Sequence, residues 1–403
     1  MAVLRVLHVT PYSADAWGYG GIPRVAAALS KGLARRGLEV TVCTTDACDA
    51  DSRLAGSHFP IVSEAQQLTC TLDGPTVRIF PNLSNRLAYH FQAFLPIGFD
   101  RFMKQHAGCF DVAHLHACRN LPGVIAARHL RRHNVPYVLA PNGTAPVIER
   151  RHTLKRGFDL VAGRRVLTGA KRLLAVSHAE AADLATLGVP EDAISVIPNP
   201  IDLEEFQTPG SGDRFRQRFD LPPGPLVLFL GKITPRKGVD VLAEAFTQLA
   251  PRSPATLVVA GNDMGGGHAA RQRLFGAGLG SRAVFTGLLT GPERLDALSA
   301  ADVVVYPSER EVFGLVAIEA LLCGTPVIVS GDSGCGEVIR ATGGGQIVPF
   351  GDAGALAQAI EHMLTETPAW REAARRAAHT VRSTYAGDVV CAQIEAMYRG
   401  MVA

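Results

Sequence analysis

The 403-residue chain lacks the features that mark membrane-spanning, secreted and metal-binding proteins. No apolar run approaches the roughly 18 residues that a membrane-spanning helix needs. The strand-like N-terminal run 3–9 is interrupted by Arg5 and His8, which argues against a secretory signal. The eight cysteines show no Cys-x-x-Cys pair and no zinc-ligand spacing, so we interpret them as reduced, mostly buried thiols. A net charge of +3 is too small to indicate nucleic acid binding, and the cytoplasm is the expected compartment.

The composition is that of an ordinary globular protein, with 47% apolar and 19% charged residues. A chain of this length predicts two domains, each large enough to bury its own core. Short apolar runs alternate with amphipathic segments of helix length, which predicts parallel sheets covered by helices on both faces. The predicted strands cover residues 3–10, 38–45, 77–80, 111–115, 137–140, 173–176 and 195–197 in the first half, and 226–230, 255–260, 283–286, 302–306, 327–330 and 346–348 in the second.

Turn-forming residues at 198–202 and 208–213 separate the two halves. We therefore predict an N-terminal domain at 1–205, a second domain at 206–385 and a final helix at 386–403. Both domains are expected to be doubly wound α/β folds, which bind ligands beyond the carboxyl ends of their strands. The residues that follow predicted strands are therefore the candidates for a site.

The most informative stretch runs from the predicted strand at 302–306 through Glu311 to Glu319. Glu311 is expected in a loop and Glu319 in the helix that follows it. Gly314 would let a ligand approach the helix N-terminus, where free N–H groups favour a phosphate. Eight helical residues separate the two carboxylates by at most roughly 12 Å, about the length of a sugar–diphosphate–ribose unit. A capping charge and a solvated glutamate would give the same pattern.

Positive charge follows the strand at 226–230. Gly231 ends this strand, and Lys232, Arg236 and Lys237 come before the next helix. Fixed positive charge at this place would bind a diphosphate and stabilise the negative charge that accumulates as a sugar leaves. The competing interpretation is a set of solvated cations at a strand end.

Glycines and histidines follow two strands of the first half. Gly20 and Gly21 lie between the first strand and a helix, where they suit either a ligand contact or a tight turn. His114 and His116 end the fourth strand, and alternation directs both side chains to the same face. Two histidines also suit a metal, but the sequence places no third ligand beside them, so we predict no metal site. We take His114 as structural. For His116 the two interpretations are a packed, hydrogen-bonded histidine and a residue that faces a ligand.

Four further residues are candidates for binding the second substrate, the acceptor, of a reaction in which a sugar is transferred. They are Tyr19, Asn142, Arg150 and Arg151. Asn142 follows the fifth strand, where it suits either an acceptor contact or a cap. The two arginines begin a basic stretch that extends to residue 172. This stretch predicts either a solvated helix face or a surface for an anionic acceptor or anionic lipid head groups.

The segment 307–328, with its two glutamates, resembles the Glu-x7-Glu signature of the retaining glycosyltransferases with the GT-B fold, family four of the nucleotide-sugar transferases. The resemblance spans nearly the whole chain and is strongest at 231–351 and weakest at 46–106. It implies an α/β protein of two Rossmann-like domains that face each other across a cleft. The first domain would bind the acceptor and the second the nucleotide sugar, while the final helix would cross back to the first.

The resemblance also implies a role for individual residues. Glu311 would contact the donor sugar, Glu319 the ribose and His116 the reacting sugar, while Lys232 and Lys237 would hold the diphosphate. The implied donor-binding set is completed by Gly20, Gly21, Gly231, Arg236, Gly261, Asn262, Gly287, Leu288, Phe313, Gly314 and Leu315. The chain departs from the family at Asn262, where a Gly-x-Gly is usual, at Lys232, where arginine is commoner, and at Cys335.

The resulting hypothesis is a metal-independent, retaining transfer of a hexosyl unit from a nucleoside-diphosphate sugar, with UDP favoured and GDP next. The acceptor would be a hydroxyl of a saccharide, polysaccharide or lipid-linked molecule, with no cofactor, no nucleic acid partner and contact with an anionic membrane surface. The alternatives are a nucleotide-sugar epimerase or glucan phosphorylase of the same fold, and a two-lobed protein that binds a small ligand. The sequence does not predict the oligomeric state.

Overall fold

The computed structural model describes residues 3–50, 52–54, 74–146, 158, 162–331 and 333–402. The chain forms two compact units, one made of residues 1–201 and 387–403 and the other of residues 202–386. The first boundary therefore falls between Ile201 and Asp202, close to the predicted 205/206. The final helix belongs to the first unit, although it follows the second in the sequence.

The first unit contains a seven-stranded parallel sheet with the order β3-β2-β1-β4-β5-β6-β7. Its strands are β1 (Arg5–Val9), β2 (Glu39–Thr45), β3 (Thr76–Phe80), β4 (Val112–His116), β5 (Tyr137–Ala140), β6 (Arg172–Ala175) and β7 (Ile194–Val196). Its helices are α1 (Gly21–Arg35), α2 (Asn85–Phe91), α3 (Phe99–His106), α4 (Leu121–Arg132), α6 (Arg164–Thr168), α7 (His178–Thr186) and α16 (Gly387–Val402). The strand order reverses between β1 and β4, which makes their carboxyl ends the expected place for a ligand.

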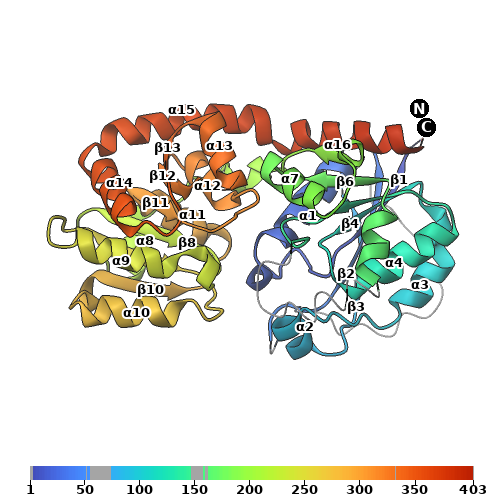
Figure 1. The fold of residues 1–403 in the computed structure, drawn as a ribbon, viewed down its shortest axis with the longest axis horizontal. Coiled ribbons are helices and arrows are strands. Elements are labelled where there is room, and N and C mark those ends of the chain that lie inside the picture. Colours follow the sequence, from blue (N-terminus) through green and yellow to red (C-terminus); the bar gives the residue numbers. More distant parts are fainter. Residues whose placement is uncertain are drawn as a thin grey trace. The chain divides into compact units, whose positions relative to one another are not determined.

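Alternate residues of these strands enter two different cores. Val6 of β1 packs with residues of α1 and α16, whereas Leu7 packs on the opposite face with residues of α3 and α4. Figure 1 shows these helices on the two sides of the sheet. The period-2 pattern explains why runs that are apolar throughout form strands: both faces of the sheet are covered.

The second unit contains a six-stranded parallel sheet with the order β10-β9-β8-β11-β12-β13. Its strands are β8 (Leu226–Leu230), β9 (Thr256–Ala260), β10 (Ala283–Gly287), β11 (Val303–Tyr306), β12 (Val327–Ser330) and β13 (Gly345–Val348). Its helices are α8 (Gly212–Arg218), α9 (Val239–Leu249), α10 (Gly267–Gly276), α11 (Gly291–Ala300), α12 (Leu315–Leu322), α13 (Gly334–Thr342), α14 (Ala353–Thr365) and α15 (Thr367–Tyr385). The order reverses between β8 and β11, the two strands that precede the predicted lysines and Glu311.

The two parallel sheets confirm the predicted α/β class, and each predicted strand overlaps an observed one. Ser177 caps α7 by accepting a hydrogen bond from the Glu180 N–H at 3.1 Å. The seven cysteines within the described ranges are free thiols. In the same ranges we find no helix that is both long and apolar enough to cross a bilayer.

Candidate active site

A cluster of four polar side chains lies beyond the carboxyl ends of β8 and β11. The Lys237 ammonium forms an ion pair with the Glu311 carboxylate and donates a hydrogen bond to the Tyr306 hydroxyl at 2.7 Å. The Tyr306 hydroxyl donates to Oε2 of Glu311 at 2.9 Å, and the Ser308 hydroxyl lies 3.3 Å from the same oxygen. The structure therefore brings together Lys237 and Glu311, which the sequence predicted separately on two loops.

The surroundings of this cluster keep the Glu311 carboxylate ionised and the Tyr306 hydroxyl neutral. Burial by itself would raise the pKa of Glu311, but the Lys237 ammonium and its hydrogen bond outweigh burial, so the pKa lies below the usual value of a glutamate. Burial, followed by the charge of Glu311, raises the pKa of Tyr306 well above that of a free tyrosine. Tyr306 therefore stays a neutral hydrogen-bond donor while Glu311 is a carboxylate.

The backbone beside this cluster is shaped by glycines. Gly261 has a φ of +151°, and a Cβ at this position would lie 1.7 Å from the Gly231 carbonyl oxygen. Gly314 has a φ of +78° immediately before α12, and a Cβ there would lie 2.3 Å from the Cys335 sulfur. These positions require glycine, and the first N–H groups of α12 lie beside Glu311 in the sequence.

The loop after β9 departs from Gly-x-Gly and is held by an aspartate instead. Asp263 accepts hydrogen bonds from the N–H groups of Gly265 at 3.0 Å and Gly267 at 3.1 Å, and it pairs with Arg271 at 2.9 Å. Asn262 joins this loop to the β8 loop, because its carbonyl accepts from the Ile233 N–H at 2.9 Å. The departure therefore gives a defined loop.

The remaining predicted donor residues of the second unit lie at strand ends or at the start of α12. Gly287 ends β10, and the Leu288 side chain that follows it is 47% exposed. Lys232 and Arg236 are half-buried in the loop after β8. Phe313 is buried against the Tyr385 ring at a centroid distance of 5.6 Å, and Leu315 is the first residue of α12. These residues therefore lie after strands of the second sheet or at the start of α12, and their donor-binding roles stay predictions.

Glu319 lies inside α12, as predicted, but its carboxylate is fully buried. It pairs with Arg294 of α11 at 2.7 Å, and Arg294 also donates to Glu205 at 2.7 Å. Arg294 is itself buried, so both charges of the Arg294–Glu319 pair lie in the interior of the second unit. The predicted ribose contact of Glu319 stays a prediction, and it now involves a carboxylate that already has a cationic partner.

The first unit gathers three histidines on one face of its sheet. His8 of β1 is opposite His114 of β4 in the strand register, and Nδ1 of His8 lies 3.0 Å from Nε2 of His116. Nδ1 of His114 lies 2.6 Å from the Tyr398 hydroxyl of α16. Burial lowers the pKa of His116 to about 3 and holds those of His8 and His114 well below the usual histidine value. The cluster is therefore neutral.

These histidines also supply the third potential metal ligand that the sequence did not indicate, since one nitrogen of each lies within 4.8 Å of the others. Their ring geometry suits packing better than coordination. The His114 and His116 rings are stacked with an interplanar angle of 11° and a centroid distance of 4.4 Å. Lone pairs lie in the ring planes, so two nearly parallel rings do not direct them toward one tetrahedral ion.

The predicted acceptor-side residues lie in different surroundings. The Tyr19 ring is 5% exposed and packs in an aromatic cluster with Tyr12 and Phe94, next to Gly20 and Gly21 at the start of α1. Asn142 follows β5 with a φ of +50°. Arg150 and Arg151 lie outside the described residues.

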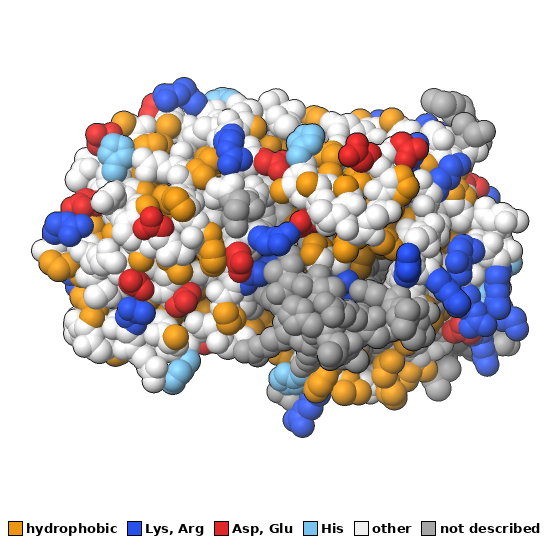
Figure 2. All heavy atoms as spheres, viewed as in Figure 1, with side chains coloured by type: hydrophobic (Ala, Val, Ile, Leu, Met, Phe, Trp, Pro, Cys, Tyr) orange, Lys and Arg blue, Asp and Glu red, His pale blue; other side chains and the backbone are white. Residues whose placement is uncertain are grey.

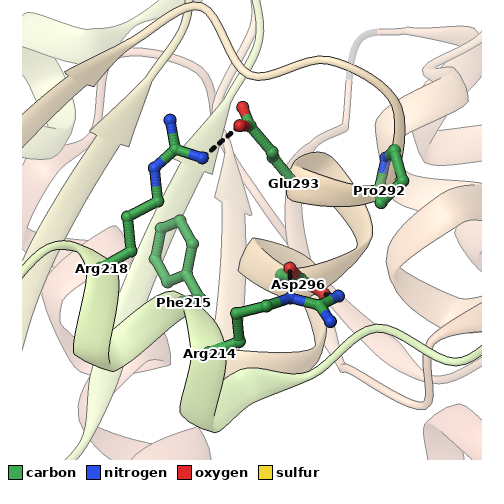
Figure 3. Close-up of a pocket in the computed structure, with 6 residues that line it drawn as sticks. All are labelled: Arg214, Phe215, Arg218, Pro292, Glu293 and Asp296. Carbon is green, nitrogen blue, oxygen red and sulfur yellow. Dashed lines mark hydrogen bonds and ion pairs between the residues drawn. The ribbon is translucent and has the colours of Figure 1, made fainter.

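A separate pocket lies between α8 and α11 and has a volume of about 220 Å³. Figure 3 shows two pairs among the residues that line it, Arg218 joined to Glu293 and Arg214 beside Asp296. The charges that line this pocket are paired with one another, and none of the predicted site residues contributes to it.

Both units match families of known glycosyltransferases. Residues 19–205 match the family described as Glycosyltransferase Family 4, and residues 213–381 match Glycosyl transferases group 1. The chain is 31% identical over 382 residues to a D-inositol 3-phosphate glycosyltransferase of Acidothermus cellulolyticus, covering 89% of this chain and 81% of the relative. The chain therefore belongs to the glycosyltransferases of family 4 and group 1. A second relative of the same name, from Mycolicibacterium smegmatis, is 30% identical over 92% of this chain and 84% of its own length.

Solved structures show the same fold for this glycosyltransferase. Anabaena HepE in complex with UDP and glucose has a TM-score of 0.75 at 19% identity, covering 98% of this chain and 100% of that chain. Sucrose-phosphate synthase from Thermosynechococcus elongatus has a TM-score of 0.73 at 22% identity, covering 99% of each. The predicted GT-B class of two Rossmann-like domains is confirmed, and the glycosyltransferase is an enzyme, as predicted.

Several polar residues of the glycosyltransferase were missed in the sequence. Tyr306 and His8 stand within strands, Arg294 and Tyr398 within helices, and Glu180 follows a helix cap. Each of these polar side chains is buried in the structure, and buried polar groups require partners. The sequence does not identify their partners on distant elements.

Proposed function

We propose that this glycosyltransferase transfers a hexosyl unit from a nucleoside-diphosphate sugar, with UDP as the favoured nucleotide. The contact between Lys237, Glu311 and Tyr306 carries the proposal, because it places a cation and a carboxylate at the strand reversal of the second unit. Lys237 and the N-terminus of α12 would compensate the charge of the diphosphate as it leaves. Anabaena HepE, which shares this fold, was solved in complex with UDP and glucose, and this supports UDP.

The roles of the other groups follow from their chemistry. Glu311 would accept a hydrogen bond from a sugar hydroxyl, and Glu319 would do so from the ribose. The neutral His116 would contact the reacting sugar from the first unit. Because amino groups and helix N–H groups already offer compensation of the phosphate charge, we propose a reaction independent of metal. Retention at the anomeric carbon is proposed from the resemblance to the retaining GT-B family alone. Metal independence predicts full turnover in the presence of a chelator.

A screen for the donor tests the proposal directly. The unfolding midpoint is measured with UDP-, GDP- and ADP-sugars, and a ligand at about 100 times its Kd adds about 2.7 kcal/mol to the free energy of unfolding. We expect stabilisation by a UDP-sugar and release of UDP when an acceptor is present. A protein that no nucleotide sugar stabilises, or that releases no nucleoside diphosphate, would contradict the proposal.

Glu311→Gln separates binding from turnover. We expect turnover to fall by about 10²–10³-fold, because an electrostatic contact to the reacting sugar is lost, while UDP still binds. Glu293→Gln is the matched control, since Glu293 is an exposed glutamate of the same unit that pairs with Arg218. Unchanged turnover in Glu311→Gln would remove Glu311 from the site. Accumulation of hexose 1-phosphate or of an epimerised donor would instead favour a phosphorylase or an epimerase.

The acceptor we propose is a saccharide or polyol that carries an anionic group, either free or on a lipid. The relatives named as D-inositol 3-phosphate glycosyltransferases support this class. The first unit also has a basic surface on α3, α4 and α6, and Figure 2 shows Lys and Arg side chains gathered over α3 and α4. Its exposed cations are Arg101, Lys104, Arg128, Arg131, Arg132, Arg164 and Arg165. The three helices contain a single carboxylate, Asp100, which pairs with His129 at 2.9 Å.

Vesicles distinguish a lipid surface from a free acceptor. Each Lys or Arg near an anionic bilayer adds at most about 1 kcal/mol, so several together are needed for binding. We expect the protein to sediment with anionic phosphatidylglycerol vesicles and not with neutral phosphatidylcholine vesicles. The pair Arg164→Glu and Arg165→Glu should reduce sedimentation. Equal sedimentation with both kinds of vesicle would contradict a charge-based membrane contact.

A further inference from the structure

The Tyr306 hydroxyl bonds to both charged groups of the candidate donor site, which also contact each other directly. It accepts a hydrogen bond from Nζ of Lys237 at 2.7 Å and donates one to Oε2 of Glu311 at 2.9 Å. The direction of both bonds is set by chemistry, because an ammonium has no acceptor and a carboxylate has no donor. Tyr306 is therefore joined to both groups at once.

Resting on the proposed function, we infer that Tyr306 is the positioning residue that holds the Glu311 carboxylate when Lys237 transfers from Glu311 to the donor diphosphate. In the structure the Lys237 ammonium is paired with Glu311. A dianionic diphosphate attracts that ammonium more strongly than one carboxylate does, so donor binding removes the ion-pair partner of Glu311 and leaves Arg236 as the other cation that favours its ionised form. The neutral hydroxyls then remain as the donors to the carboxylate.

The hydrogen bonds of the carboxylate leave one oxygen for the sugar. The bonds from Tyr306 and Ser308 both end on Oε2 of Glu311. Charge-assisted hydrogen bonds of this kind orient a carboxylate plane strongly. Oε1 is then the oxygen directed to a sugar hydroxyl, and its direction depends on the anchoring of Oε2.

Packing holds the Tyr306 ring in addition to the two hydrogen bonds of its hydroxyl. The side chain is 6% exposed, and its ring is stacked with that of Phe229 at a centroid distance of 6.0 Å and an angle of 23°. A Cβ on Gly231 would lie 3.1 Å from a carbon of the ring, so the glycine at the end of β8 makes room for it. Tyr306→Phe should therefore keep the ring in place and remove only the oxygen.

A packing role for Tyr306 and a role in positioning Glu311 predict different effects when the hydroxyl is removed. If Tyr306 only fills the core between β8 and β11, loss of the oxygen changes stability and leaves the catalytic constants unchanged. If it positions Glu311, the loss lowers kcat with little change in UDP affinity, because the diphosphate is held by other groups. It also changes the pH dependence, since Glu311 loses a hydrogen bond that favours its ionised form.

The test compares Tyr306→Phe with Tyr385→Phe in the full chain, using a UDP-sugar and the acceptor that the wild-type protein uses. Tyr385 is a buried tyrosine of the same unit, and its replacement also removes a single phenolic oxygen. For Tyr306→Phe we expect kcat to fall about tenfold to hundredfold, as for loss of a hydrogen bond to a charged group. We expect the Kd for UDP, measured by calorimetry, to change by less than about threefold. The acid limb of the kcat profile should move to higher pH, and Tyr385→Phe should behave as wild type.

Two results would overturn the inference while the proposed function stands: wild-type kcat and an unchanged acid limb in Tyr306→Phe, or equal losses of UDP binding and turnover together with a lower unfolding midpoint. Absence of turnover by the wild-type protein with every nucleotide sugar would overturn the proposed function, and this inference with it.

Discussion

The two units hold buried polar groups beside their central strands in opposite ways. In the second unit the groups are charged and paired, as in Lys237 with Glu311 and Arg294 with Glu319. In the first unit the three histidines beside β1 and β4, His8, His114 and His116, are neutral because burial lowers their pKa values, although Asp46 after β2 is buried and paired with Arg53. Burial of a single charge is costly, so each unit has avoided it by its own means.

This difference bears on the kind of ligand each unit can bind. In a buried ion pair, a ligand phosphate can replace the carboxylate, so that the cation keeps an anionic partner. A set of neutral imidazoles offers donors and acceptors but no charge, which suits the hydroxyl groups of a sugar. The contrast agrees with the proposal that the second unit binds the donor diphosphate while His116 of the first contacts the sugar.

The largest effect should come from leaving one charge of the second unit without its partner. In Arg294→Met the Glu319 carboxylate stays fully buried without its cation, so we expect the free energy of unfolding to fall by about 3–5 kcal/mol. Glu319→Gln combined with Arg294→Met should recover most of that loss. Urea denaturation in a Trp17→Phe background measures it, because the remaining tryptophan, Trp370, then reports on the second unit alone.

An exposed ion pair supplies the control for Arg294→Met. Arg252 pairs with Glu361 at 3.0 Å, and its side chain is 52% exposed. Solvent screens such a pair, so Arg252→Met should leave the denaturation midpoint of the second unit unchanged. If Arg294→Met behaved like Arg252→Met, the interior of the second unit would tolerate an unpaired carboxylate, and the contrast with the first unit would fail.

The sequence predicted the framework of both units because their strands are buried on both faces. A short, continuous apolar run such as 226–230 is typical of a strand covered by helices on each side, and glycines or polar residues mark where each run ends. Glu311 and Lys237 were found in this way, since each follows a strand end. Their direct contact was not predicted, because it depends on which strands are neighbours. The local hydrophobic pattern identifies a strand but does not predict its place in the sheet.

The residues that the sequence analysis missed have partners on elements that are distant in the sequence. His8 was used only as an argument against a signal peptide, although it is the partner of His116. Arg294 was not singled out in the sequence, and only the packing of α11 against α12 makes it the partner of Glu319. Contacts between distant elements are therefore what the structure adds.

In the first unit, the contrast can be sharpened by titrating a buried acid. Burial raises the pKa of Glu180 to about 7, and the N–H groups of Val176 and Gly143 that donate to it offset this only in part. Between pH 4.5 and about 7 the folded state therefore binds more protons than the unfolded state. The free energy of unfolding should fall as pH rises through this window, by about 3 kcal/mol in all, and not change further from this group above it.

Glu180→Gln should remove this pH dependence, since an amide keeps an oxygen acceptor but does not titrate. The measurement is urea denaturation from pH 4.5 to 8 in a Trp370→Phe background, in which Trp17 reports on the first unit. A slope of the same size in Glu180→Gln and in the parent would show that other groups cause it. A slope of opposite sign would show that Glu180 is ionised in the folded state, as Glu311 is in the second unit.

The smallest effect should come from the hydrogen bond that ties α16 to the histidines. Tyr398→Phe removes the hydroxyl 2.6 Å from Nδ1 of His114 and leaves a buried ring nitrogen without that partner, which costs about 1–3 kcal/mol. Tyr12→Phe is the control, because its hydroxyl bonds to the exposed side chain of Gln92, where water can replace it. We expect the Trp17 transition to move to lower urea in Tyr398→Phe and to stay near the parent value in Tyr12→Phe. Nε2 of His114 and Nδ1 of His116 already have no hydrogen-bond partner within the described part of the chain. Equal shifts in the two variants would mean that the bond from Tyr398 adds no stability either, so that neutrality alone suffices for these histidines.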